Sequence, residues 1–229
     1  MSQASTATSD PDVLRVLLQY QNEFSDALGA LKASGIFVYR QAGNISLRWP
    51  GKDRLILANT NPPNGGVPVA VNFDLSEPQG EFNNGLRDVV QLHIAILQAR
   101  PDVNAVFHLH TPYLTGYATA GRSLPNQYIP LITRARENIP VSKWGARYEA
   151  EPLNELLAEH PDASAALISN HGPFTWGKSI REAVNYLITL EESAHVFFVA
   201  EQLGGIRPLP EDAYARVVSG PSHPAAFQN

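Results

Sequence analysis

The chain of 229 residues contains no cysteine. Disulfide bonds and thiolate ligands are therefore excluded, and any bound metal must be held by histidine, aspartate or glutamate side chains. Basic runs are absent, and the net charge of −5 argues against a nucleic-acid-binding protein. No apolar stretch reaches the roughly 18 residues that a membrane-spanning helix needs. We expect neither nucleic acid nor a membrane among the partners of this protein.

The first ten residues, MSQASTATSD, are polar and lack the apolar segment of a signal peptide. We expect residues 1–9 to form a disordered tail and the protein to be cytoplasmic. Hydrophobic residues make up 44% of the chain and charged residues 17%, which allows a substantial core. No linker, low-complexity stretch or internal repeat divides the remainder. We therefore predict a single domain over residues 10–229.

Hydrophobic periodicity predicts the helices and strands. A long helix should begin at Asp10 and Pro11, which suit the N-cap and the first helical position, and end at Gly35. Other helices are expected over 86–99, 113–121, 153–159 and 179–203, the last opened by a capping box, and strands over 36–39, 44–49, 54–58, 67–73, 103–110, 165–170 and 173–176. The stretch 123–139 is expected to be irregular. Because strands cluster without a helix between each pair, we predict an α/β fold with a mixed or antiparallel sheet flanked by helices.

Two histidines stand two residues apart in VFHLHTPY, where an apolar run ends before a proline. Residues i and i+2 point to the same face of a strand, so His108 and His110 should leave the sheet on one side. Such a pair suits two metal ligands from one strand. The alternative is a pair of polar residues at a strand end, one of them bonded to a carbonyl group.

A third histidine stands in a similar place, because the predicted strand 165–170 runs into His171 and Gly172. If the two strands are neighbours, His108, His110 and His171 surround one point. Three neutral imidazoles leave coordination positions open on a divalent metal, as catalysis requires. The competing interpretation is a loop histidine that is satisfied by its own hydrogen bonds.

Four blocks of the sequence resemble the class II aldolase/adducin family. They are GNISLR (43–48), PDVNAVFHLHTPY (101–113), LISNHGPFTWGKSIREA (167–183) and the Glu-Ser-Ala pattern at 192–194. The resemblance spans about residues 13–207 and implies a three-layer α/β/α fold with a central, mainly antiparallel sheet. It implies one divalent metal ion (Zn, Fe(II), Mn or Co) on His108, His110 and His171, with Asn44 on the substrate loop. Members of the family are usually cyclic homotetramers with active sites between subunits.

The sequence departs from the family at its acidic catalytic residue. Aldolases of the family carry this residue on the helix before the histidine strand. When His93 is aligned with the family's helical histidine, the position falls on Val89. Asp88 is adjacent, but neighbouring helical residues point about 100° apart, so it does not simply replace the acid. A register error of one residue would restore the acid.

A second departure concerns the phosphate of sugar-phosphate members, which hold it with hydroxyl and glycine residues. Here the corresponding turn reads Asn59-Thr60-Asn61-Pro62-Pro63, and proline has no N–H to donate. We therefore expect an unphosphorylated carboxylate as substrate. Arginine suits a carboxylate and aromatic side chains suit a ring or prenyl chain. The candidate substrate-binding residues are Tyr39, Arg40, Tyr113 and Arg134, with Trp144 as a further contact, and the candidate catalytic residues are Asn44, Tyr128 and Arg136.

Loss of the acidic residue hurts aldol cleavage most, because that reaction needs a base to begin. Decarboxylation needs none, so we favour a metal-dependent lyase that decarboxylates an aromatic, hydroxy or oxo carboxylate. The alternative within the same fold is a non-haem Fe(II) oxygenase acting on a hydroxyphenylpyruvate-like or mandelate-like acid. The other alternative is a non-catalytic, adducin-like binding module, against which the retained histidines argue.

Overall fold

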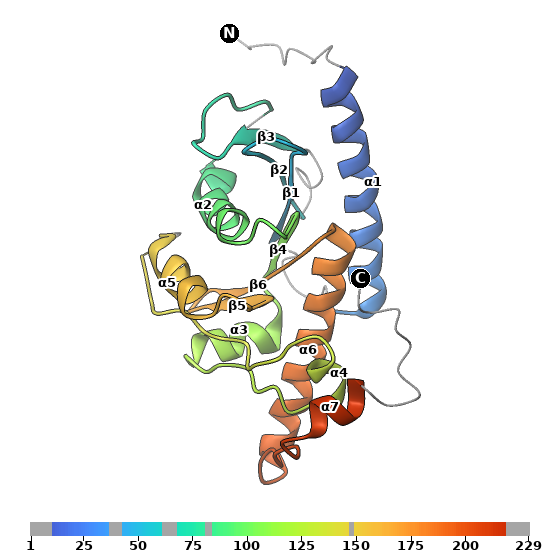
Figure 1. Cartoon of the computed structure of the whole chain (residues 1–229), viewed down its shortest axis with the longest axis vertical. Coiled ribbons are helices and arrows are strands. Elements are labelled where there is room, and N and C mark those ends of the chain that lie inside the picture. Colours follow the sequence, from blue (N-terminus) through green and yellow to red (C-terminus); the bar gives the residue numbers. More distant parts are fainter. Residues whose placement is uncertain (1–10, 37–42, 61–67, 81–83, 147–148, 219–229) are drawn as a thin grey trace.

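The computed structural model describes residues 11–36, 43–60, 68–80, 84–146 and 149–218 (Figure 1). The predicted tail 1–9, most of the predicted strand 36–39 and the candidate residues Tyr39 and Arg40 lie outside the described residues. So do Asn61, Pro62 and Pro63 of the proline-rich turn. The expectations that fall on these segments stay predictions, as does the single domain over 10–229.

Six strands form one sheet in the order β3-β2-β1-β4-β6-β5. Every neighbouring pair is antiparallel. The strands are β1 (Gly43–Arg48), β2 (Arg54–Asn59), β3 (Val69–Asn72), β4 (Ala105–Leu109), β5 (Ala165–Ile168) and β6 (Gly172–Gly177). The predicted central antiparallel sheet is thus confirmed, with β1 and β4 at its centre.

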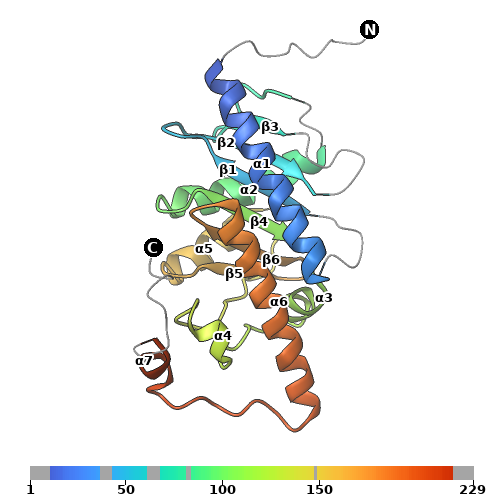
Figure 2. The ribbon, with the colours of Figure 1, turned by 90° about the vertical axis from the view of Figure 1, so that its right-hand side faces the viewer.

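Helices cover both faces of the sheet. The helices are α1 (Pro11–Ser34), α2 (Asn84–Ala99), α3 (Pro112–Thr119), α4 (Ile129–Ile132), α5 (Glu151–Glu159), α6 (Ile180–Gln202) and α7 (Ala213–Val218). Helices α2 and α5 pack on one face, and α1 and α6 run side by side over the other, as Figure 2 shows. The three-layer prediction is confirmed, while the short helices α4 and α7 were not expected. No helix in the described residues is long and apolar enough to cross a membrane.

Strand alternation divides the core into two clusters and also places the polar residues. In β1, Ile45 and Leu47 face α1 and α6, so Asn44 and Ser46 face α2. In β4, Phe107 faces α6, so His108 faces α2. The polar residues of the two central strands therefore meet under α2, at the end of the sheet where β4 leaves for α3.

Candidate metal centre

The centre of the site is a row of residues that lie opposite one another across three strands. Asn44 on β1 pairs in register with His108 on β4, and His108 pairs with Phe174 on β6. Directly opposite residues share a face of the sheet. The rings of His108 and Phe174 accordingly stack with centroids 4.3 Å apart.

The orientation of His108 is fixed by a backbone carbonyl. Its Nδ1–H donates to the Pro173 carbonyl oxygen at 2.7 Å, so Nε2 carries the lone pair. Burial, followed by the neighbouring His171 and His110, holds the pKa of His108 well below its ordinary value. This neutral, oriented imidazole is the form that binds a metal.

His110 lies one residue beyond β4, and its Nε2 is 3.3 Å from Nε2 of His108. Both rings lie close to Gly172, where an added Cβ would be in van der Waals contact with them, 3.4 Å from His110 and 3.5 Å from His108. The convergence predicted from the His-x-His spacing is therefore present.

His171 reaches the same point from the turn between β5 and β6. Ile168 pairs with Gly172, so Ser169, Asn170 and His171 form a three-residue loop. Asn170 adopts φ 56°, a left-handed conformation that asparagine tolerates better than most residues. The turn thus places a histidine from the far edge of the sheet beside those of β4.

The three histidines form a group that fits a metal ion. Their ligand atoms all lie within 4.8 Å of one another. Zinc–nitrogen bonds of about 2.0–2.1 Å in a tetrahedral site put the nitrogens about 3.3 Å apart. The His108–His110 separation already has this value. Within the described residues, no carboxylate joins the group.

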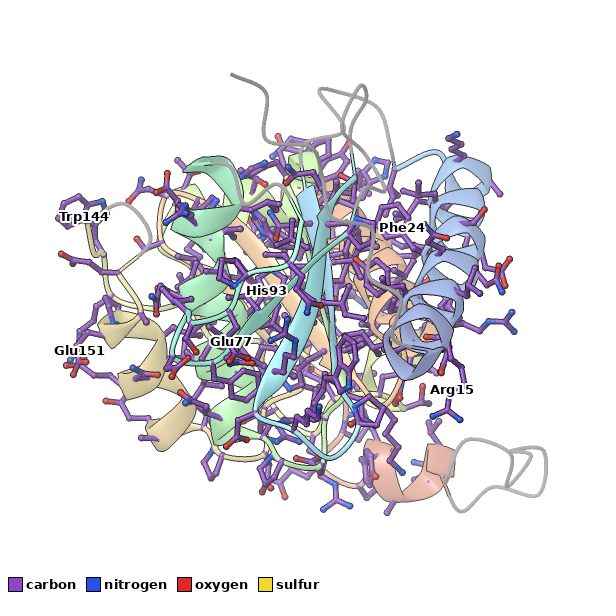
Figure 3. The ribbon with its side chains drawn as sticks, turned by 90° about the horizontal axis from the view of Figure 1, so that it is seen from above. Arg15, Phe24, Glu77, His93, Trp144 and Glu151 are labelled. Atoms are coloured by element: carbon purple, nitrogen blue, oxygen red, sulfur yellow. The ribbon has the colours of Figure 1, made fainter. Side chains whose placement is uncertain are left out.

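A fourth histidine, His93 on α2, is buried directly above this row, between the helix and the strands (Figure 3). Its Nε2 lies 2.6 Å from Asn44 Oδ1, and its Nδ1 lies 2.7 Å from Ser46 Oγ. Burial lowers the pKa of His93 to about 3, so the ring is neutral. Ser46 and His93 were not among the predicted site residues. The available signals were the polar alternation at positions 44 and 46 and a single histidine within the apolar helix.

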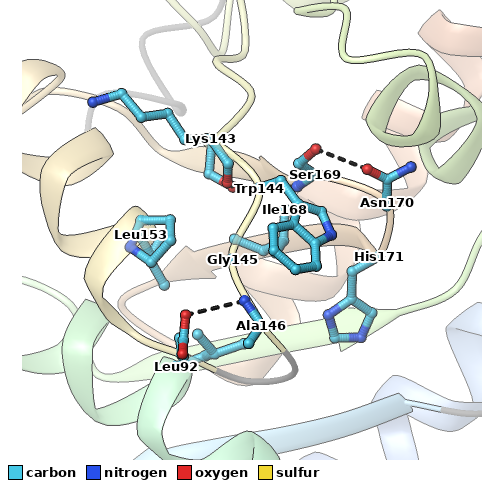
Figure 4. Close-up of a pocket in the computed structure, with 13 residues that line it drawn as sticks. Leu92, Lys143, Trp144, Gly145, Ala146, Leu153, Ile168, Ser169, Asn170 and His171 are labelled. Atoms are coloured by element: carbon cyan, nitrogen blue, oxygen red, sulfur yellow. Dashed lines mark hydrogen bonds between the residues drawn. The ribbon is translucent and has the colours of Figure 1, made fainter.

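A cavity of about 320 Å³ opens beside His171 (Figure 4). Its wall combines Trp144 with the apolar side chains of Leu92, Pro152, Leu153 and Ile168. The Trp144 side chain is exposed, with 68% of its surface accessible, at the edge of the molecule. The one lysine of the lining, Lys143, pairs with Glu155 at 2.8 Å. The rest of the lining is largely polar, with Ser142, Ser169, Asn170 and Glu149, so the cavity combines an apolar, partly aromatic wall with polar groups next to His171.

Comparison with known families decides the identity of the fold. The family described as Class II Aldolase and Adducin N-terminal domain matches residues 26–198, which include all three histidines. The chain belongs to this family. The resemblance stated from the four sequence blocks is thereby confirmed.

Curated relatives of this class II aldolase family member include an aldolase and two decarboxylases, as well as an oxygenase and an epimerase. The chain is 29% identical over 128 residues to a 5-methylthioribulose-1-phosphate/5-deoxyribulose-1-phosphate aldolase of Rhodospirillum rubrum, covering 56% of this chain and 58% of that protein. It is 29% identical over 177 residues to the 3-oxo-tetronate 4-phosphate decarboxylase of Escherichia coli O6:H1, covering 73% and 79%. It is 29% identical over 143 residues to the 3,4-dihydroxyphthalate decarboxylase of Rhodococcus jostii, covering 59% of each. These relatives support a lyase.

A solved structure has the same fold. The L-fuculose 1-phosphate aldolase of Glaciozyma antarctica superposes with a TM-score of 0.71 at 22% identity, over 96% of this chain and 88% of that one. The likeness extends beyond the histidine strands to nearly the whole class II aldolase fold.

Val89, which sequence alignment matches to the aldolases' acidic residue, is buried with 2% of its surface exposed. It packs in the apolar cluster under α2, one helical turn before His93. Asp88 is half-buried and Arg87 is exposed. If the alignment of His93 with the family's helical histidine holds, α2 presents a hydrocarbon side chain where the aldolases carry their acid.

The remaining candidate substrate-binding and catalytic residues do not join the three histidines within the described part of the chain. The Tyr113 ring stacks on His195 of α6 at 4.2 Å, and the Tyr128 hydroxyl donates to Glu192 of α6 at 3.4 Å. Burial raises the pKa of Tyr186 to about 12, and the positive charge of Arg134 is near enough to lower it in part. Arg136 is exposed. Within one chain, Tyr113 and Tyr128 thus lie against α6, on the face of the sheet opposite Asn44 and His108.

Proposed function

We propose that this class II aldolase family member is a metal-dependent lyase that decarboxylates an unphosphorylated carboxylate with an aromatic or other apolar group. The convergence of His108, His110 and His171 carries the proposal. These residues would hold one divalent ion: zinc, ferrous iron, manganese or cobalt. Bound there, the ion would act as a Lewis acid toward the substrate's oxygens.

Decarboxylation suits the groups that this chain offers. The carboxylate leaves as carbon dioxide, its bonding electron pair stays on the substrate, and a proton takes the place of carbon dioxide on the carbon. No base is needed to begin, which agrees with Val89 at the position of the acid. Asn44, beside His108, would place N–H donors near the oxygen on which negative charge develops.

The cavity beside His171 suggests where the rest of the substrate lies. Trp144, Leu92 and Leu153 would contact an aromatic ring or an alkyl chain rather than a phosphate. The name of the dihydroxyphthalate decarboxylase specifies no phosphate group, whereas the names of the other two relatives do. The apolar wall of the cavity, formed by Trp144, Leu92 and Leu153, is the support for the unphosphorylated class.

Metal analysis of protein purified without oxygen, followed by assays of carbon dioxide release from ortho-hydroxybenzoates, tests the proposal. Zinc, manganese or cobalt with carbon dioxide release is the expected result. Bound ferrous iron with oxygen consumption would replace it with the oxygenase function. Turnover of fuculose or ribulose phosphate at millimolar levels would contradict the exclusion of sugar phosphates.

We also propose a homotetramer in which Tyr128 or Arg136 faces a neighbour's metal centre. The support is that Tyr128 lies against α6 in its own chain, that Arg136 is exposed, and that exposed apolar residues, Ile129 and Phe198 among them, occur on α4 and α6. Light scattering should give about four times 25.0 kDa. A 25.0 kDa species at micromolar concentration would contradict this assembly.

A further inference from the structure

The contact between His93 and Asn44 determines which end of the Asn44 amide faces the metal centre. Asn44 Oδ1 is taken up by His93 Nε2 at 2.6 Å. The Asn44 side chain retains 8% exposure, and within the described residues its Nδ2 group donates no hydrogen bond to the protein. With Oδ1 against His93, the amide keeps its two N–H donors for another partner, on a side chain that lies opposite His108 in the sheet.

The direction of this hydrogen bond depends in turn on Ser46. The Ser46 hydroxyl, fully buried, lies 2.7 Å from His93 Nδ1. When this hydroxyl donates to Nδ1, the proton of the neutral imidazole must sit on Nε2, where it donates to Asn44 Oδ1. The opposite tautomer would leave Nε2 as an acceptor and would attract the amide's NH₂ end instead. Ser46, His93 and Asn44 thus form a directed chain of hydrogen bonds.

We propose that His93 is a positioning residue that holds the Asn44 amide with its N–H donors toward the metal centre, and so selects substrates that present an anionic oxygen there. The proposal rests on the proposed function for the identity of the substrate oxygen. His93 itself contacts neither the substrate nor the metal. Its ring packs edge-on against Phe174 at 5.6 Å, and the same Phe174 ring stacks on His108 at 4.3 Å.

The tautomer of His93 is a test that needs no metal. Nitrogen-15 NMR of histidine-labelled, metal-free protein should show His93 neutral and protonated on Nε2. In Ser46→Ala, which removes the hydroxyl that donates to Nδ1, the second tautomer should appear. A wild-type His93 protonated on Nδ1 would mean that the amide is reversed, and would overturn the proposal.

A binding cycle tests the consequence for substrates. Cobalt-loaded protein is titrated with salicylate, and the change in the visible spectrum gives its Kd. Asn44→Ala and His93→Gln should each raise this Kd by roughly tenfold or more with cobalt occupancy unchanged, and the double variant no further than the larger single effect. His160→Gln, at a histidine that pairs with Glu137 away from the site, is the matched control.

The outcomes separate the two proposals. A wild-type protein that binds no cobalt would overturn the proposed function, and the NMR result would then decide for or against His93 alone. Cobalt and salicylate binding that His93→Gln leaves unchanged would overturn the positioning role. Additive effects of Asn44→Ala and His93→Gln would do the same, because residues that act through one contact do not add.

Discussion

The two faces of the sheet each bury a polar system, and the two systems differ in charge. Under α2, His93 forms hydrogen bonds with Asn44 and Ser46, and all three side chains are uncharged. Under α6, the Glu191 carboxylate, with 4% exposure, accepts hydrogen bonds of 2.9 Å from the Tyr113 and Leu114 backbone N–H groups.

The difference shows which surroundings stabilise a buried carboxylate in this fold. Glu191 lies at the N-terminus of α3, where unpaired amides and the helix dipole stabilise negative charge. The position corresponding to the aldolase acid, Val89, has neither. The buried carboxylate of Glu191 thus stabilises the packing of α3 on α6, whereas the imidazoles on the α2 face are uncharged.

The largest expected effect is on the metal side of this comparison. His108→Ala, His110→Ala and His171→Ala should each lower metal affinity by more than about hundredfold, because loss of even an outer-shell partner costs about 10–100-fold. Activity should fall with metal occupancy while the fold is retained. Equilibrium dialysis with elemental analysis measures the affinity. Full occupancy in any two variants would rule out the triad.

A charge placed on the α2 face should be the next largest effect. Val89→Glu introduces a carboxylate that would repel an anionic substrate by roughly 1–4 kcal/mol at 4 Å, or about fivefold to several hundredfold in activity. Val89→Gln, similar in size but neutral, separates this effect from burial of a polar side chain. Asp88→Asn should change kcat/KM little. If Asp88→Asn abolished activity while Val89→Glu were tolerated, the register would be off by one and aldol cleavage would become the favoured reaction.

Neutralising the anion of the α6 face should cost stability without affecting the metal. Glu191→Gln leaves one backbone N–H poorly paired, which should lower the free energy of unfolding by about 1–3 kcal/mol. Urea unfolding measures this change. Glu192→Gln, at the exposed neighbouring position, should have little effect. Loss of bound metal in Glu191→Gln at unchanged stability would show that the two faces are not independent.

Within one pH unit, an effect of about the same size or smaller should appear in the pH dependence of stability of the metal-free protein. The pKa of His93 is about 3 in the folded state, below the ordinary value of 6.5, so the unfolded state binds the extra proton between these limits. Stability therefore rises with pH, and each unit below about 6.5 costs up to about 1.4 kcal/mol. His93→Gln should flatten this slope in urea titrations. An unchanged slope would show that His93 titrates normally.

Much of this site could be predicted from local pattern. Period-two spacing gave the convergence of His108 and His110, and the strand-to-loop position of His171 matched its place in the structure. The clustering of strands indicated the antiparallel sheet. These features depend on backbone geometry that a few residues determine, so the sequence displays them directly.

The rest depended on contacts between distant segments. Ser46 and His93 are 47 positions apart and meet only because α2 crosses β1. Tyr113 and Tyr128 were predicted from residue type alone, and their partners on α6 lie 64 or more positions away. Local sequence patterns do not report contacts between such distant segments, and they do not report contacts with a neighbouring subunit either.

The strand order has a consequence for the time course of folding. The strands that pair with β4 are β1 and β6, and both are distant from it in sequence. We therefore expect these pairings to form later than the local hairpins β1–β2 and β5–β6. His108 and His171 come together only when β4 has joined the β5–β6 hairpin. An ion that needs all three histidines binds only after this step, and it then slows the return to partly folded chains by mass action. Added metal would thus lengthen the lifetime of the finished sheet without hastening its assembly.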